Sequence, residues 1–563
     1  MLFRSRFVLA GTLCLLMAHS CGNPEPPLTN RAAGTLGIVA SGHEEATRAG
    51  MRILEQGGNA ADAAAATLLA LSVKTIGAFC IGGEVPLIYY EAASGVVTVL
   101  NGQGGAPLDS AAIAWYYANT IPGSDIRSAA VPAVVDLCVT TLKRFGTRSF
   151  SQTAAPTLKL LDAGGPEWYR DTSDGDTIHT GRNWYADLAV TLRKLNEAEK
   201  RSQGEREQKL QAVADRFYRG DIADELEKWY IQEGGFLRKG DLAAHVTRIE
   251  TPVTLDYKGY TICKCGPWTQ GPWVLQALRL LEGCDLRGMG HNSADYIHTV
   301  AEAMKLALAD RDEYYGDPEY VEVPLARLLS DEYTALRRPL IDSGRASPSL
   351  RPGDPFGMRA LRPGGGRPFP AMGGTTICAV ADRWGNVAVC TPSGLGSRAG
   401  TGGATGITHG TRLVIFNTWP DHPNRIEPGK RPRTTLTPTL VLRDGRPALA
   451  ISVAGGDMQD QAALQIILNV IEFGMDAGEA WSARRFSTNH FIGSFGQDPP
   501  RLADLRLPDA LSPEVVADLE GRGHHVKVTR ENPGGVALLQ WEETGGVVQA
   551  AGGRSSALEG NVK

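Results

Sequence analysis

A run dense in glycine and proline, residues 346–374, divides the chain into two parts and ends directly on a pair of threonines. Residues 140–330 have mainly helical patterning, whereas the part beyond the run is rich in strand patterns. Because such a composition does not hold regular structure, we expect 346–374 to be a flexible linker. The residues that follow, 375–381, alternate as in a β-strand, so the linker ends abruptly at Gly374.

The junction between Gly374 and Thr375 suggests a chemistry. If this bond were cut, Thr375 would gain a free α-amine beside its own hydroxyl. An α-amine has a pKa near neutrality and can take the hydroxyl proton without a histidine. A linker that ends at a fixed strand also suits self-cleavage. The simpler interpretation is that Thr375 and Thr376 only begin a strand, where threonine is common, and this stretch alone favours the simpler one.

A second candidate element is a glycine pair between a strand and a helix. Residues 448–453 form the strand pattern, Gly455 and Gly456 follow, and 459–473 have the apolar spacing of a core-facing helix, with Asp457 as the expected N-cap. Glycines leave backbone N–H groups bare and let a ligand come close. Such donors can stabilise the oxyanion that forms when a hydroxyl attacks an amide. A plain tight turn is the alternative.

The N-terminal part predicts several helices. An apolar stripe from Ala46 to Leu54 predicts a helix, Gly57 and Gly58 end it, and Asn59 caps an alanine-rich helix that is apolar nearly all round and therefore buried. Residues 196–218 mix both signs of charge and predict one exposed helix. Residues 291–317 predict another, capped at Asn292 or Ser293.

Other classes of function find little support in the sequence. Hydrophobic residues make up 42%, charged residues 21%, and the net charge is −5, so no nucleic-acid partner is indicated. A P-loop, a G-x-S-x-G elbow and a zinc-protease motif are absent. Cys263 and Cys265 would share a strand face, but a structural zinc needs four ligands, so we expect packed thiols. We therefore expect no metal and no organic cofactor.

The first twenty residues predict export. Arg4 and Arg6 precede an apolar run that is too short to span a bilayer, which is typical of a secretory signal over residues 1–20. Small residues before Cys21 resemble a bacterial lipoprotein signal, although His19 makes the match imperfect. Ordinary secretion and lipid anchoring at Cys21 both stay open. In either case we expect a periplasmic or extracellular protein, with contact to a membrane only through that anchor.

Several motifs in order along the chain, "GGNAADAAAATLLAL", "FYRGDIADEL", "GGTT", "EPGKRPRTTLTPTLVL" and "AGGDMQDQ" among them, resemble the γ-glutamyltransferase (γ-glutamyltranspeptidase) family of N-terminal nucleophile hydrolases. The resemblance runs from Gly37 to the C-terminus. It implies an α/β fold, an αββα sandwich made as one precursor. It also implies self-cleavage into a large subunit, 21–374, and a small catalytic subunit, 375–563, which stay associated as a heterodimer.

The resemblance also implies roles for individual residues. Thr375 falls on the family's nucleophile and new N-terminus, and Ser393 falls near a second hydroxyl residue that supports it. Gly455 and Gly456 fall on the oxyanion-hole pair. The residues expected to bind the substrate donor are Thr434 and Thr435, in the place of two serines that hold its carboxylate, and Asp421, which matches an acidic residue that holds its α-amine.

Departures from the family pattern concern the substrate. Gln103 stands where the family usually has an arginine that grips the donor carboxylate, and losing this charged partner should weaken recognition by a few kcal/mol. The asparagine expected just after Ser393 is not apparent. Asp457, with Gln459 and Gln461, is unusual for a γ-glutamyl enzyme and could serve a different pocket.

The leading hypothesis is therefore an amide hydrolase or acyltransferase that cuts itself at Gly374–Thr375 and acts on γ-glutamyl, glutathione-like or related small-molecule amides. One alternative is an acylase or oxamate-type amidohydrolase with no γ-glutamyl specificity, which the Gln103 departure favours. Another alternative is a non-catalytic envelope binding protein with the same fold. Retention of Thr375, Ser393 and both glycines argues against that last alternative.

Overall fold

The computed structural model describes residues 28–123, 125–165, 168–170, 177–179, 183–357, 359–360, 374–394, 399–530, 532–542 and 546–559. The expected signal segment 1–20 and Cys21 lie outside the described residues. None of the helices within the described ranges combines the length and the apolarity that crossing a bilayer requires.

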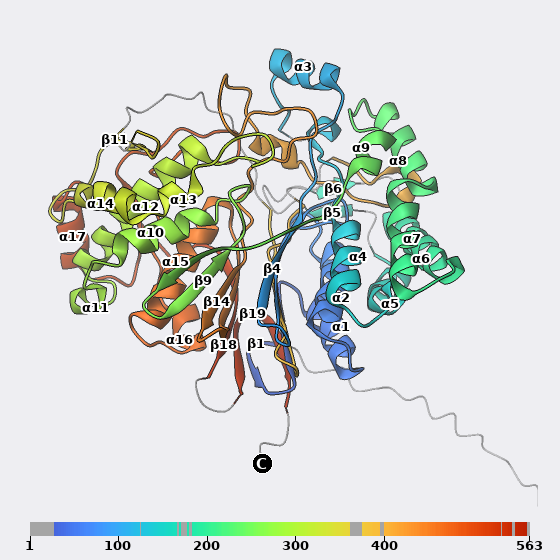
Figure 1. Cartoon of the computed structure of the whole chain (residues 1–563), viewed down its shortest axis with the longest axis horizontal. Coiled ribbons are helices and arrows are strands. Elements are labelled where there is room, and N and C mark those ends of the chain that lie inside the picture. The colour runs from blue at the N-terminus through green and yellow to red at the C-terminus, as the bar shows by residue number, and fades with distance from the viewer. Residues whose placement is uncertain are drawn as a thin grey trace, which may run out of the picture.

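Thirteen strands form one continuous hydrogen-bonded network at the centre of the molecule (Figure 1). Their order is β7-β4-β3-β13-β12-β2-β19-β18-β15-β14-β9-β8, and β1 pairs with β19 at one side. The strands are β1 (Thr29–Gly34), β2 (Gly37–Ser41), β3 (Val85–Glu91), β4 (Val96–Gly102), β7 (Arg248–Glu250), β8 (Val253–Tyr257), β9 (Tyr260–Lys264), β12 (Cys378–Asp382), β13 (Val387–Cys390), β14 (Thr439–Arg443), β15 (Arg446–Ala454), β18 (Gly535–Trp541) and β19 (Val548–Leu558).

The strand β19 joins two layers of this network. Its first half pairs with β18 and its second half, residues 554–558, pairs with β2. Between the halves, Gly552 and Gly553 have positive φ angles of 82° and 59°, which only glycine adopts easily. The side chains between the layers are buried and mostly apolar, for example Ala379, Val389, Leu440 and Leu539. The network is therefore two packed sheets that share one strand.

Helices cover both outer faces of the two sheets, on opposite sides of the molecule in Figure 1. The helices over the β2 and β12 sheet are α1 (Glu44–Glu55), α2 (Ala60–Lys74) and α4 (Val134–Phe145), with α5 (Phe150–Asp162), α6 (Trp184–Arg201), α7 (Arg206–Tyr218) and α8 (Asp221–Gln232) outside them. Those over the β14 and β15 sheet are α10 (Pro272–Leu281), α12 (Ala294–Tyr314), α15 (Gln459–Ile471), α16 (Ala477–Ser482) and α17 (Pro513–Gly521). The αββα sandwich is thus confirmed.

Smaller elements complete the described structure. The short helices are α3 (Ser110–Asn119), α9 (Lys239–Ala244), α11 (Leu286–Met289), α13 (Leu325–Leu328) and α14 (Asp331–Arg337). The two-stranded sheets pair β5 (Trp168–Arg170) with β6 (Thr177–His179), β10 (Gly353–Asp354) with β11 (Arg359–Ala360), and β16 (Asp504–Pro508) with β17 (His525–Thr529).

Several local predictions are confirmed. Asn59 caps α2 by accepting from the Asp62 amide, and Asp62 completes a capping box. Nearly every residue of α2 is buried. Ser293 caps α12. The thiols of Cys263 and Cys265 are packed in the core, as expected.

Other local predictions are wrong in part. Residues 196–218 form the end of α6 and all of α7, with a break at Ser202, and α7 buries an apolar face that includes Phe217. Strand β12 begins at Cys378, three residues after Thr375. All its residues are buried, since one face packs on helices and the other on the second sheet.

The expected linker 346–374 is packed in its first part. Arg351 makes a 2.8 Å ion pair with Glu302 of α12, and the Gly353 amide donates to Asp310 at 2.7 Å. These contacts join residues 346–357 to the second helical layer. The rest of the run up to residue 373, except 359–360, lies outside the described residues.

Candidate active site

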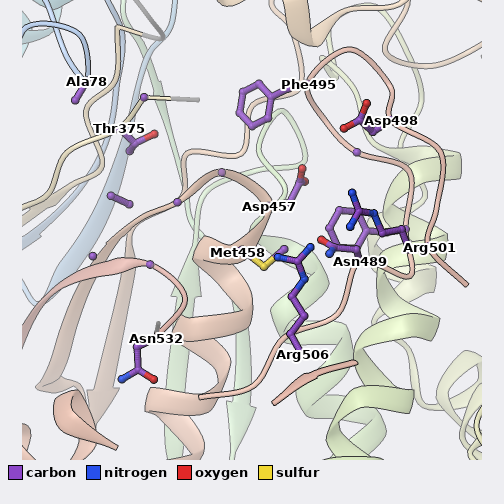
Figure 2. Close-up of a pocket in the computed structure, with 18 of the residues that line it drawn as sticks. Ala78, Thr375, Asp457, Met458, Asn489, Phe495, Asp498, Arg501, Arg506 and Asn532 are labelled. Carbon is purple, nitrogen blue, oxygen red and sulfur yellow. The ribbon is translucent and has the colours of Figure 1, made fainter. Parts of the chain in front are cut away.

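Thr375 lies at the wall of a cavity of about 860 Å³ (Figure 2). Gly374, Gly455, Gly456 and Asp457 line the same cavity, so five residues predicted from the sequence meet here. The other lining residues come mostly from residues 489–506 and 532–535: they are Ala78, Ala454, Met458, Asn489, Phe491, Gly493, Phe495, Asp498, Pro499, Arg501, Arg506, Asn532, Gly534 and Gly535.

The chain after Thr375 is held firmly by its backbone. The Thr376 amide donates to Pro392 at 2.9 Å, and the Gly42 amide donates to Ile377 at 3.0 Å. A side chain at Gly42 would not fit, because a Cβ there would lie 2.0 Å from the hydroxyl oxygen of Thr376. Thr375 therefore stands at the entrance to β12 on a fixed support.

Ser393 contacts the bond that is expected to be cut. Its hydroxyl donates to the carbonyl oxygen of Gly374 at 2.5 Å. The same hydroxyl oxygen accepts from Nη2 of Arg412 at 2.6 Å. A cation one hydrogen bond away strengthens the hydroxyl as a donor and polarises the Gly374 carbonyl. The sequence-predicted role of Ser393 beside Thr375 thus has a specific geometry.

The cation belongs to a buried ion pair. Nε of Arg412 donates to the Glu84 carboxylate at 2.6 Å, and both side chains are almost fully buried. Burial raises the pKa of Glu84, and the Arg412 guanidinium opposes this shift. The backbones of Glu84 and Ser393 also pair, with N–H to O distances of 2.9 and 3.0 Å. The pair therefore sits rigidly behind Ser393.

The glycine pair forms the turn from β15 into the helical segment. Gly455 and Gly456 have φ angles of 136° and 59°, which explains the glycines at both positions. Their amides lie at the N-terminal end of η5 (Gly456–Met458) and α15, where the helix dipole favours negative charge. The Gln459 carboxamide, with its oxygen facing the turn, accepts from the Gly456 amide at 3.1 Å. An oxyanion would have to displace that contact.

Asp457 is not the N-cap of α15, because a distant cation engages its carboxylate instead. Oδ1 accepts from Nη1 of the buried Arg311 at 2.7 Å and from the Ser494 hydroxyl at 2.6 Å, and Oδ2 accepts from the Ser494 amide at 2.9 Å. Met458 occupies the N-cap position without a side-chain bond. Asp457 therefore fastens residues 489–506 to the glycine turn.

Three of the predicted donor-binding residues do not line the cavity. Gln103 is fully buried, and its Nε2 donates to the carbonyl of Pro432. Thr434 and Thr435 are also fully buried, and the Thr434 hydroxyl accepts from the Leu436 amide. Within the described residues, Oε1 of Gln103 and Oγ1 of Thr435 have no hydrogen-bond partner. The structure thus places these side chains in the interior, outside the lining of the cavity.

Asp421 points away from the interior altogether. Its side chain is 100% exposed, its φ angle is 57°, and its ion pair with Arg425 spans 4.0 Å. It does not line the cavity. The described geometry gives this carboxylate no position from which to hold a substrate amine.

Four charged residues of the site were missed from the sequence. Glu84 and Arg412 lie 328 positions apart, and only a charge inside an otherwise apolar Gly-Gly turn could have drawn attention to Glu84. Arg501 and Arg506 belong to a stretch with glycine, proline and phenylalanine that carries no motif. Their role depends on the fold that brings the stretch to Thr375.

A group of possible metal ligands lies away from the cavity. Among the described residues, His298, Glu302 and His524 have donor atoms within 4.8 Å of one another. Glu302 is already paired with Lys305 at 2.7 Å and with Arg351, and the two imidazoles bond each other at 2.9 Å. The two cations oppose a bound metal ion, so we interpret the group as a hydrogen-bonded core cluster.

Known proteins resemble this chain over nearly its whole length. The sequence pattern of the family "Gamma-glutamyltranspeptidase" matches residues 46–558. A "Glutathione hydrolase proenzyme" of Bacillus subtilis (strain 168) is 29% identical over 548 residues, covering 91% of this chain and 89% of the relative. The solved structure of LmbA2991HD is 32% identical with a TM-score of 0.82, covering 94% and 99% of the two chains. A cephalosporin acylase from Bacillus halodurans is 25% identical with a TM-score of 0.79, covering 97% and 100%.

Proposed function

The chain belongs to the gamma-glutamyltranspeptidase family, and from this membership we propose that it cuts itself between Gly374 and Thr375 and then uses Thr375 to cleave amide bonds. One observation carries the proposal. The Gly374 carbonyl accepts a hydrogen bond from the Ser393 hydroxyl, and Gly374, Thr375 and the glycine turn line the same cavity. Its enzyme relatives give no support to a non-catalytic binding protein.

In the self-cleavage step, Oγ1 of Thr375 attacks the carbonyl carbon of Gly374. The C–N bond breaks, the hydroxyl proton passes to the leaving nitrogen, and an ester remains. Water then hydrolyses the ester and frees both ends. Ser393, backed by Arg412, stabilises the charge that develops on the Gly374 oxygen.

In the catalytic step, the new α-amine of Thr375 accepts the proton of its own hydroxyl. The hydroxyl oxygen attacks the amide of the substrate, and the amides of Gly455 and Gly456 hold the oxyanion. Loss of the amine leaves an acyl ester on Thr375. Water releases the acyl group in hydrolysis, and a second amine releases it in transfer.

Two donor classes follow from the named relatives, γ-glutamyl compounds such as glutathione and acyl amides such as those of acylases. The burial of Gln103, and the exposure of Asp421, favour an acyl amide, since neither side chain is placed to grip an amino acid donor. Reaction with γ-glutamyl-p-nitroanilide against a panel of acyl anilides separates the classes.

Intact mass and N-terminal sequencing of the purified chain after incubation at neutral pH test the proposal. We expect two fragments, the smaller one beginning Thr-Thr-Ile-Cys, and one uncut chain from the Thr375→Ala variant. Thr375→Ser should still be cut, because serine keeps the hydroxyl. Full amidase activity in a chain that stays uncut would overturn the proposal.

Export is a further part of the proposal, based on residues 1–21. We expect the two subunits as a heterodimer in the periplasm or outside the cell. Cell fractionation and the mass of the large fragment test this, since lipidation at Cys21 adds the mass of acyl chains and Cys21→Ala removes it. A large fragment that keeps Met1 would contradict export by cleavage.

A further inference from the structure

Two arginines form the wall of the cavity that faces Thr375. Figure 2 shows Thr375 on one side and Arg501 and Arg506 together on the other, beside Asn489, with Met458 between. Phe491, Phe495 and Met458 are among the apolar side chains that line the cavity. The cavity therefore combines a nucleophile, an apolar middle and a positive end.

Neither arginine has a close carboxylate partner. Nε of Arg506 lies 3.8 Å from Oδ2 of Asp504, and that oxygen already accepts from the Asn489 amide at 2.9 Å. The same Nε is buried, without a hydrogen-bond partner in the described part of the chain. Arg501 forms no ion pair with any described residue, although it lines the cavity. Both guanidinium groups are thus available to an anion.

The acidic residues of the cavity do not neutralise this wall. The Asp457 carboxylate is occupied by Arg311 and Ser494. Asp498 is exposed and makes no ion pair with either arginine. A planar guanidinium binds a carboxylate through two parallel hydrogen bonds, which makes arginine the residue of choice for this anion.

We propose that Arg501 and Arg506 bind a carboxylate of the substrate, so that the preferred substrates are amides that carry a carboxylate a few methylene groups away from the scissile bond. This inference rests on the proposed function and names its substrate class. The arginines would take over recognition from position 103, where a buried glutamine cannot supply charge. The methylene groups would pack on Phe491 and Met458.

The test compares substrates of equal length with and without the charge. Glutaryl-p-nitroanilide and pentanoyl-p-nitroanilide differ only in the terminal carboxylate, placed on the acyl side. Pentanoyl amides of 4-aminobutyrate and of butylamine differ only in a terminal carboxylate on the amine side. We expect kcat/KM to favour the charged member of one pair about 10- to 100-fold, as for a hydrogen bond to a charged group. Near equality in both pairs would overturn the inference.

Variants assign the preference to the two residues. Arg501→Gln and Arg506→Gln should each lower kcat/KM for the preferred anionic substrate about tenfold or more, mainly through KM, and change the uncharged substrate less than about threefold. Arg506→Lys should recover part of the effect, which a purely structural role would not predict. Arg530→Gln, whose side chain is 93% exposed and outside the cavity, is the matched control.

A binding measurement separates this inference from the proposed function. Titration calorimetry of the full chain carrying Thr375→Ala with glutarate needs no turnover and no self-cleavage. Binding that is lost in Arg501→Gln and weakened by salt supports the arginine site even if the chain never cuts itself. Cleavage and amidase activity with no preference for any carboxylate would leave the proposed function standing and overturn the inference.

Discussion

The Ser393 hydroxyl donates to the Gly374 carbonyl oxygen at an O···O distance of 2.5 Å, and the two residues are 19 positions apart. This contact places a hydrogen-bond donor on the atom that would become negative if Thr375 attacked. In this structure it lies on the main chain of the protein itself, not on a substrate. The contact therefore acts in the self-cleavage step, before any substrate is bound.

Ser393→Ala should slow self-cleavage about 100-fold, because one donor to the developing oxyanion is lost. The rate can be followed by the appearance of the fragment that begins at Thr375. Ser482→Ala is a suitable control, since the Ser482 hydroxyl also donates to a glycine carbonyl, that of Gly478 at 2.7 Å, and both residues belong to α16 and lie outside the lining of the cavity. Equal rates in Ser393→Ala and the unaltered chain would contradict the assigned contact.

Substitutions of Arg412 and Glu84, the ion pair behind Ser393, should have non-additive effects on the free energy of unfolding. Arg412→Met leaves the Glu84 carboxylate buried without its partner, and we expect a loss of about 3–5 kcal/mol in the free energy of unfolding. Combining it with Glu84→Gln should recover much of that stability but not the rate of self-cleavage, because Ser393 still lacks its cation. Urea unfolding in the Thr375→Ala background measures the first effect. A double variant as unstable as Arg412→Met would contradict the coupling.

His409 should make stability depend on pH. Its Nδ1 faces the Ile407 carbonyl at 2.8 Å, the Tyr230 hydroxyl lies 2.7 Å from Nε2, and burial lowers its pKa to about 4. The unfolded chain protonates this imidazole below about pH 6.5, so the folded state loses stability as the pH falls from there towards 4. Between pH 7 and 4.5, the free energy of unfolding of the unaltered chain should fall by about 2 kcal/mol more than that of His409→Gln. Equal dependence of the free energy of unfolding on pH in the two proteins would contradict this.

Gln103→Arg should fail to create a γ-glutamyl enzyme. The side chain is enclosed, and the guanidinium of Arg431, which donates to the nearby Asn101 carbonyl at 3.1 Å, is an unfavourable neighbour for a second cation. We expect a loss of about 3 kcal/mol or more in the free energy of unfolding, with no gain in turnover of γ-glutamyl-p-nitroanilide. Gln103→Leu controls for the lost bond to Pro432. A stable variant with raised γ-glutamyl turnover would show that this position opens to the substrate.

Local sequence patterns predicted the parts of the fold that local forces decide. The cap at Asn59 and the turn at Gly455 and Gly456 each depend on neighbouring residues only, and the apolar residues all round α2 indicated that this helix is buried. The strand that follows Thr375 was predicted for the same reason, although β12 begins three residues later, at Cys378. The two-layer arrangement was not readable from these patterns and came from the resemblance.

Non-local contacts explain what the sequence could not predict. Asp457 had every local feature of an N-cap, but Arg311, 146 positions earlier, engages its carboxylate. Leaving a buried guanidinium without a carboxylate costs about 3–5 kcal/mol, whereas losing an N-cap costs about 1 kcal/mol, so the ion pair decides where the Asp457 carboxylate binds. The pairing of Arg412 with Glu84 is of the same kind, and so is the approach of Arg501 to the cavity.

The path of the strands through the two sheets has a consequence for the lifetime of the enzyme. Strands from before the cleavage position pair with strands from after it: β2 lies between β12 and β19, β3 pairs with β13, and β9 pairs with β14. Cutting the chain releases no separate domain, yet it abolishes the tether that holds the halves at high effective concentration. The precursor can refold as a first-order process, whereas the two fragments, once unfolded, must find each other in dilute solution. The lifetime of the mature protein would then be set by its rate of unfolding, because the unfolded fragments refold only slowly.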